Sequence, residues 1–121
     1  MKPLNQLNYQ DKCQLLFDLF PKEVPTFFDF AIEINIQIIA DNVEGIQPPN
    51  ALFRSSVLSH QFALLRTCQM TGNYNNWILT KPSYIRCSAA FFHHCFLKYR
   101  EQNKASKQLA AAIDLFFNLS E

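Results

Sequence analysis

Glycine is scarce in this chain of 121 residues, which contains only Gly45 and Gly72. A chain with two glycines can hardly build a glycine-rich phosphate loop or the tight turn of a nucleophile elbow. It also lacks the frequent turn residues of an all-β sandwich. With 49% apolar residues it is too hydrophobic for a disordered segment. These absences favour a mostly helical protein.

Long hydrophobic runs are also missing. The most apolar stretch, Phe27 to Ala40, is interrupted by Asp29, Glu33, Asn35 and Gln37. It is therefore shorter than the run of about 20 apolar residues that a membrane-spanning helix needs. We expect a soluble protein with no membrane partner.

Cysteine occurs without the spacings that suggest a cross-link. Cys13, Cys68, Cys87 and Cys95 form no Cys-x-x-Cys pair, and a domain of this size can form a core without disulfides. We interpret them as reduced thiols. The first twenty residues contain no uninterrupted apolar segment followed by a small-residue cleavage site, so we expect no secretory signal and a cytoplasmic location.

Metal-binding patterns are absent as well. A metal site could be suspected from the three histidines and two cysteines, which are His60, His93, His94, Cys87 and Cys95. However, no Glu-x-x-His or His-Glu-x-x-His sequence occurs. Cys87 and His94 are separated by roughly 10 Å along a helix, which is too far for joint chelation. The sequence therefore predicts no metal and no cofactor.

Apolar residues recur at helical spacing in five segments, which predicts an all-α, compact bundle of four to five helices in a single domain, residues 1–121. The segments are about 9–20, 26–44, 51–71, 82–104 and 106–119. Asn8 and Asn50 are candidate N-caps, and Gly45 and Gly72 are candidate stops. The expected core residues are Cys13, Leu16, Phe17, Phe20, Val57 or Leu58, Phe62, Leu65, Ile85, Ala89, Phe92, Phe96, Tyr99, Leu109, Ile113, Phe116 and Phe117.

The second segment permits two interpretations, because apolar residues alternate strictly from Phe28 to Ile38 and would also fit a strand. Such a strand would exceed the usual length of 5 to 6 residues and would find no alternating partner. A helix instead gathers Asp29, Glu33, Gln37 and Glu44 into one polar stripe. We favour the helix, which is apolar around most of its girth and is therefore either central or part of a homodimer interface.

Charge is distributed unevenly behind a net value of +1. Residues 1–50 hold three lysines and seven acids, and residues 51–121 hold eight basic residues and three acids. No carboxylate lies between Glu44 and Glu101, an interval that contains Arg54, Arg66 and Arg86. One interpretation is an anionic partner such as nucleic acid or an acidic protein. The other is that acidic helices pack beside basic ones and neutralise them, with Arg86 paired to Asp18 or Glu33.

Two aromatic residues, Tyr74 and Trp77, stand in a polar loop that follows Gly72. Such side chains can stack on bases or anchor a protein partner. Alternatively, Trp77 folds back and covers the open end of the bundle, because a single tryptophan in a small domain is usually at least half buried.

Two arginine–histidine pairs, Arg54-x5-His60 and Arg86-x6-His93, loosely resemble the motif of HEPN-type helical ribonucleases. The resemblance covers eight residues or fewer, and directly after the arginine stand Ser55 and Cys87 instead of the polar residue that these enzymes usually have there. It implies that a histidine transfers a proton and an arginine holds a phosphate. If the chain is not such an enzyme, His93 should pack against Phe92, Phe96 or the last helix.

The sequence therefore favours a non-catalytic helical bundle that acts through protein–protein contacts, with a protein partner or a homodimer. The expected partner-binding residues are Tyr74, Trp77, Arg54, Arg66 and Arg86. The alternatives are nucleic-acid binding by the basic segment 45–100 and the ribonuclease that the HEPN resemblance implies.

Overall fold

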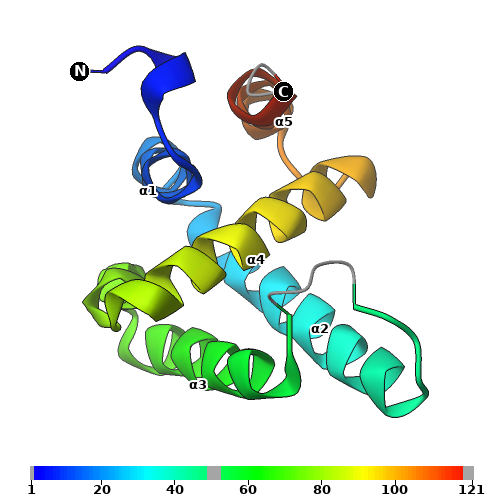
Figure 1. Ribbon diagram of the computed structural model, residues 1–121. Helices are drawn as coiled ribbons and strands as arrows, with labels where there is room; N and C mark the ends of the chain where they lie inside the picture. The colour runs from blue at the N-terminus through cyan, green and yellow to red at the C-terminus, as the bar shows by residue number, and fades with distance from the viewer. Residues whose placement is uncertain (1, 49–52, 119–121) are drawn as a thin grey trace.

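Five α-helices and three short helical segments form the structure, a computed structural model that describes residues 2–48 and 53–118 (Figure 1). No strand occurs in these ranges. The predicted all-α bundle is confirmed. The elements are η1 (Leu4–Gln6), α1 (Tyr9–Leu19), α2 (Val24–Val43), α3 (Ser55–Thr71), η2 (Tyr74–Leu79), α4 (Pro82–Glu101), α5 (Lys107–Ile113) and η3 (Asp114–Asn118).

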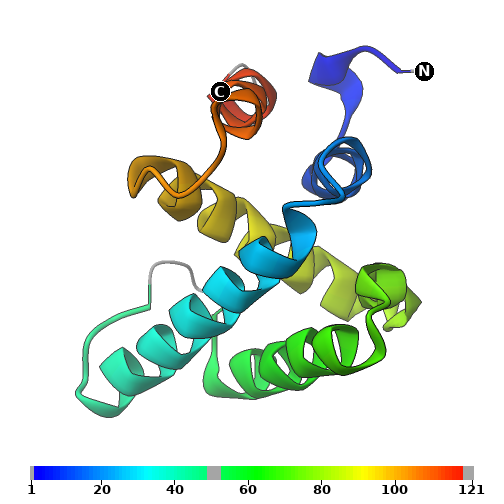
Figure 2. The same ribbon diagram turned by 180° about the vertical axis from the view of Figure 1, so that it is seen from behind.

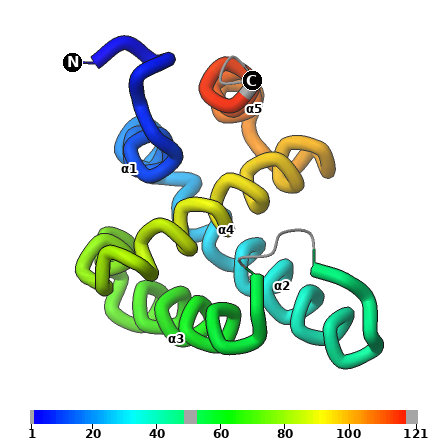
Figure 3. Tube along the Cα trace, in the orientation of Figure 1, coloured from blue at the N-terminus to red at the C-terminus, as the bar shows by residue number. Residues whose placement is uncertain are grey.

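Helix α4 crosses the middle of the molecule, with α1 and α5 on one side and α2 and α3 on the other (Figure 1). The tube in Figure 3 shows the chain turning sharply from α1 into α2, which passes behind α4 and then lies beside α3. A central position requires apolar side chains on several faces. Helix α4 meets this need with Ala89, Phe91, Phe92, Cys95 and Phe96, which are all buried.

Local sequence signals set most helix ends. The Asn8 side chain accepts a hydrogen bond from the Asp11 amide at 2.8 Å and caps α1, and Ser106 caps α5 in the same way. Gly72 ends α3 in the left-handed region with φ +70°, where a glycine has no steric penalty. These ends follow the predicted ones.

The ambiguous second segment is a helix, and its predicted polar stripe is exposed to solvent. The opposite side of α2 is buried, including Asn35, whose side-chain amide donates to the Leu58 carbonyl of α3 at 3.1 Å. This bond satisfies a buried donor that would otherwise be costly. It also fixes how α2 lies along α3.

An aromatic cluster forms the core between α1, α2 and α4. Phe27 stacks on Phe96 with ring centroids 4.1 Å apart, and Phe17 meets Phe92 edge to face at 5.2 Å. Such pairs contribute about 0.5–1.5 kcal/mol each beyond burial. The expected core residues are buried, except that Val57, Phe20, Phe62 and Ile85 are half-buried.

Two expected boundaries are wrong. Helix α3 begins at Ser55 rather than at Ala51: Phe53 and Arg54 are not helical, Arg54 is extended, and the Phe53 ring packs against Phe91 of α4. The expected N-cap, Asn50, lies outside the described residues. Residues 74–79, expected as a loop, form the 3-10 helix η2.

Candidate protein-binding site

Trp77 lies in the core, which corrects its assignment as a partner-binding residue. The indole is fully buried and meets Phe92 edge to face at 5.4 Å. Its N–H donates to the Gln14 side-chain oxygen at 3.1 Å, so the polar end of the ring is satisfied inside the protein. The alternative interpretation, in which Trp77 covers the bundle, is the one observed.

Tyr74 occupies the opposite position, at the surface. Its ring is half-buried and stands edge to face on Phe28 of α2 with centroids 4.8 Å apart. Asn73 caps η2 by accepting from the Asn75 amide at 3.2 Å, which stabilises the first turn of η2. Tyr74 therefore presents one side of a fixed aromatic ring to solvent.

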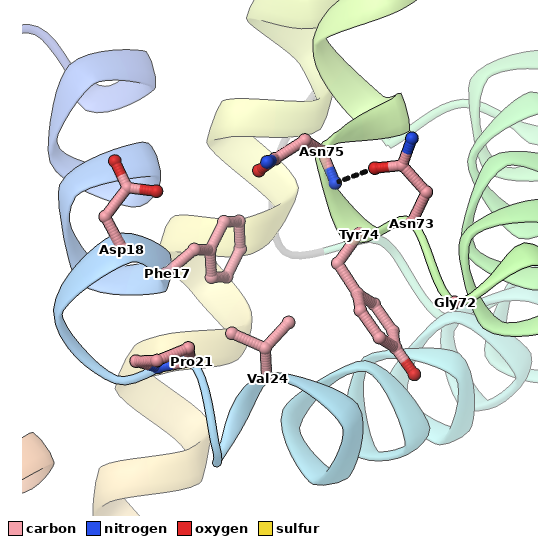
Figure 4. Close-up of a pocket in the computed structure, with 8 residues that line it drawn as sticks. All are labelled: Phe17, Asp18, Pro21, Val24, Gly72, Asn73, Tyr74 and Asn75. Carbon is pink, nitrogen blue, oxygen red and sulfur yellow. Dashed lines mark hydrogen bonds between the residues drawn. The ribbon is translucent and has the colours of Figure 1, made fainter.

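This ring forms one wall of a surface pocket of about 330 Å³. Figure 4 shows the opposite wall, where Phe17 and Val24 point into the space from the corner between α1 and α2. The remaining lining residues are Asp18, Pro21, Gly72, Asn73 and Asn75. The pocket therefore has a mixed lining, in which the apolar side chains stand beside amide and carboxylate groups.

Gln14 links the two walls of the pocket. Its side-chain nitrogen donates to Asp18 at 2.9 Å and to Asn75 at 3.0 Å, and its oxygen accepts from the Trp77 indole. All hydrogen-bonding groups of this amide are therefore used. The network ties η2 to α1 and fixes the width of the pocket.

Asp18 is the charged group at the site. The carboxylate is exposed and forms no ion pair with any residue in the described ranges. It also borders a second surface pocket of about 420 Å³, which Lys2, Leu7, Asp11 and Leu15 help to line. The surface around Asp18 therefore combines negative charge with exposed apolar lining, and it can hold a cation that carries an apolar stem.

Among the described residues, no lysine or arginine forms an ion pair with an acidic residue of α1 or α2. Within residues 2–48 and 53–118 the ion pairs are Lys98 with Glu101 and Arg100 with Asp114. The expected pairing of Arg86 with Asp18 or Glu33 is wrong. Arg86 is exposed and lies two residues before the buried Ser88, so it points away from the packed side of α4.

The other two predicted arginines lie on or beside α3 and away from the pocket. Arg54 is exposed immediately before Ser55. Arg66 is exposed and donates to the Gln69 side-chain oxygen at 3.1 Å, and Gln69 in turn donates to Asp29 of α2. The structure therefore does not bring Arg54, Arg66 and Arg86 together with Tyr74 in one site.

The histidines of the ribonuclease-like pairs pack against aromatic rings. His93 stacks on Tyr9 at 4.3 Å and lies 4.5 Å from Phe117, so it contacts the C-terminal segment as expected of a structural residue. His60 stacks on Tyr84 at 3.9 Å and is within hydrogen-bond distance of Thr80. These contacts hold α1, α3 and the C-terminal segment against α4.

No group of three or more His, Cys, Asp or Glu side chains in the described part of the chain could hold a metal ion. Within the same residues, no helix has the length and apolar character to cross a membrane. All four cysteines are free, and burial raises the pKa of Cys68 to about 11.

Sequence reasoning found Tyr74 but missed the rest of the site. Phe17 was expected only as a core residue and Asp18 only as an ion-pair partner of Arg86, and Gln14, Pro21 and Val24 were not predicted as site residues. A candidate signal was Pro21, which ends α1 and places a sharp corner opposite η2. The pairing of that corner with residues more than fifty positions away has no local signal.

No protein family, no curated protein and no solved structure matches this chain.

Proposed function

We propose that this protein is a non-catalytic binding module that recognises another protein through the pocket between Phe17, Val24 and Tyr74. The observation that carries the proposal is the position of Asp18, an exposed carboxylate without an ion pair among the described residues, in a surface pocket that also has aromatic and aliphatic walls. We further propose that it acts in the cytoplasm, because all four thiols are unpaired.

The chemistry of the pocket favours an arginine or lysine side chain of the partner. Tyrosine, tryptophan and arginine are the usual anchors of protein interfaces, and they fill preformed pockets. The aliphatic part of such a basic side chain packs against the wall formed by Phe17, Val24 and Tyr74, while its charged end pairs with Asp18 at the edge of the pocket. The pocket of about 330 Å³ has room for one such side chain.

A peptide selection tests this proposal. A random peptide library is selected against the folded chain, and the selected peptides are measured against three variants. Asp18→Asn and Tyr74→Ala should each weaken binding about tenfold or more, the effect of losing one anchor contact. Asp41→Asn is the matched control, because Asp41 also accepts from a glutamine four residues earlier but lies at the far end of α2.

The expected peptides contain arginine or lysine and shift the amide NMR signals of residues 72–75. Peptides that bind Asp18→Asn and Tyr74→Ala as tightly as they bind the wild type would refute the site. A selection that returns no peptide above background would refute the function.

Nucleic-acid binding is a second candidate, and a specific observation favours it. Arg54, Lys81 and Arg86 are exposed, and none has a carboxylate of the described residues within ion-pair distance. If they contact phosphates, affinity for mixed-sequence RNA or DNA should fall steeply as salt increases. Arg86→Ala should reduce that slope by about one. Absence of binding at low salt refutes this candidate.

A further inference from the structure

The side of α2 and α3 that faces away from α4 is uncovered. Figure 2 shows these two helices side by side with no other helix over them. Ile36 is 52% exposed on this side and Val43 is 83% exposed. Ile36 lies about two and a half turns after Phe27, which stacks on Phe96 of α4, so Ile36 is on the opposite side of the helix.

Charges of opposite sign flank these apolar residues. Asp29 and Glu33 are exposed on α2, and Arg66 is exposed on α3. The contacts of Asn35 with Leu58 and of Asp29 with Gln69 show that the two helices run antiparallel, which places Arg66 between Asp29 and Glu33 along the helix pair, within about one helical turn of Glu33. Neither Glu33 nor Arg66 forms an ion pair with a described residue.

We propose that the protein forms a two-fold symmetric homodimer through this α2–α3 outer face, which comprises Asp29, Glu33, Ile36, Val43, Ser59 and Arg66. A two-fold axis parallel to the helix pair sets α2 of one copy against α3 of the other. Arg66 of each copy then faces Glu33 of the other copy, and the contact occurs twice because the interface is isologous. Ile36 packs over α3 of the other copy, near the small Ser59.

The charge pattern selects this arrangement over its alternatives. Packing α2 against α2 of a second copy would bring the acidic pairs together, and like charges across an interface are strongly unfavourable. A purely basic partner would complement only the acidic residues of α2, and a purely acidic partner would complement only Arg66 of α3. A second copy satisfies both helices at once.

The available area is sufficient for a dimer. Helix α2 has 20 residues, so the face is about 30 Å long, and two adjacent helices are about 20 Å wide. Each copy therefore contributes roughly 600 Å², or about 1,200 Å² for the pair, which is the lower end of the range for stable complexes.

Sedimentation equilibrium of the full chain tests the proposal. The wild type should be dimeric, and Ile36→Asp should be monomeric while its far-UV circular dichroism stays unchanged. Leu115→Asp is the matched control, because Leu115 is 50% exposed but lies in η3, away from this face. A monomeric wild type, or a dimer that survives Ile36→Asp, would overturn the proposal.

A charge exchange tests the two-fold arrangement itself. Glu33→Lys and Arg66→Glu should each weaken dimerisation at least about tenfold, because each places two like-charged pairs in the interface. The double variant should regain the wild-type dissociation constant, since the pairs are restored with reversed sign. Failure to regain it would overturn this pairing of α2 with α3.

The dimer face and the pocket have no residue in common, so variants can test them independently. Tyr74→Ala and Asp18→Asn should remain dimeric, and Ile36→Asp should still bind the selected peptides. Loss of dimerisation in Tyr74→Ala would contradict the assigned face. A dimer without peptide binding would refute the pocket alone.

Discussion

Replacement of Trp77 measures how much the buried indole contributes to stability. The side chain is 0% exposed, meets Phe17 and Phe92 edge to face, and donates to Gln14. Trp77→Ala removes all of these contacts and leaves a cavity, so it should cost about 3–5 kcal/mol. That is a large part of the about 5–15 kcal/mol that stabilises a domain of this size.

A milder change separates the hydrogen bond from the packing. Trp77→Phe keeps an aromatic ring but loses the N–H donor, and we expect a cost of about 2 kcal/mol. About 1 kcal/mol comes from the hydrogen bond to Gln14 and the rest from the smaller ring. A double-mutant cycle with Gln14→Ala should give a coupling energy of about 1 kcal/mol between the two side chains.

Urea unfolding followed by far-UV circular dichroism gives these free energies without using the tryptophan as a reporter. Leu79→Ala is the control, because Leu79 belongs to the same 3-10 helix but is 78% exposed, and it should change stability by less than about 0.5 kcal/mol. The reasoning is refuted if Trp77→Ala costs no more than this control. The indole would then lie at the surface.

Three further predictions concern pH, backbone geometry and thiol reactivity. Burial lowers the pKa of His94 in the folded state, and the positive charge of the nearby Lys98 lowers it further. The unfolded chain therefore binds more protons than the folded protein. The free energy of unfolding should fall as the pH drops below about 6.5. His94→Gln should weaken this dependence in urea unfolding, and an unchanged profile would contradict it. Gly72→Ala should cost about 1 kcal/mol in thermal unfolding, purely from φ +70°, because an added Cβ meets no atom within 4 Å; a neutral result would contradict the left-handed cap. A thiol reagent should modify the half-buried Cys87 first in the native protein. The other three thiols are buried, and burial raises their pKa values. Equal modification rates for all four cysteines would contradict the burial of those three.

Helix existence, most helix ends and the core were accessible from the sequence because they depend on local patterns. The spacing of Cys13, Leu16 and Phe17 predicts one buried face of α1, and all three are buried. Gly72 could be predicted as the end of α3 because glycine adopts the left-handed conformation of a helix C-terminus readily, independently of tertiary packing. The alternation in α2 could be resolved because the helical stripe of polar residues is long enough to outweigh the strand pattern.

The site and the direction of single side chains depended on tertiary structure. The expected α3 start is wrong because Phe53 is buried against Phe91 of α4 and Arg54 is extended, and such a tertiary contact can outweigh local helix propensity. The sequence left Trp77 open between a surface anchor and a residue that covers the bundle. Only the tertiary structure shows that its N–H donates to Gln14, more than sixty positions earlier.

The sequence by itself determined an all-α fold with an acidic first half and a basic second half, because composition and helical period do not depend on how the helices pack. Only the tertiary structure decided which charges remain unpaired. Asp18 and Arg86 were expected as partners, yet the packing of α1 and α4 leaves both exposed and unpaired among the described residues. Charge pairing needs two side chains on facing surfaces, and the relative rotation of two helices is set by their buried sides.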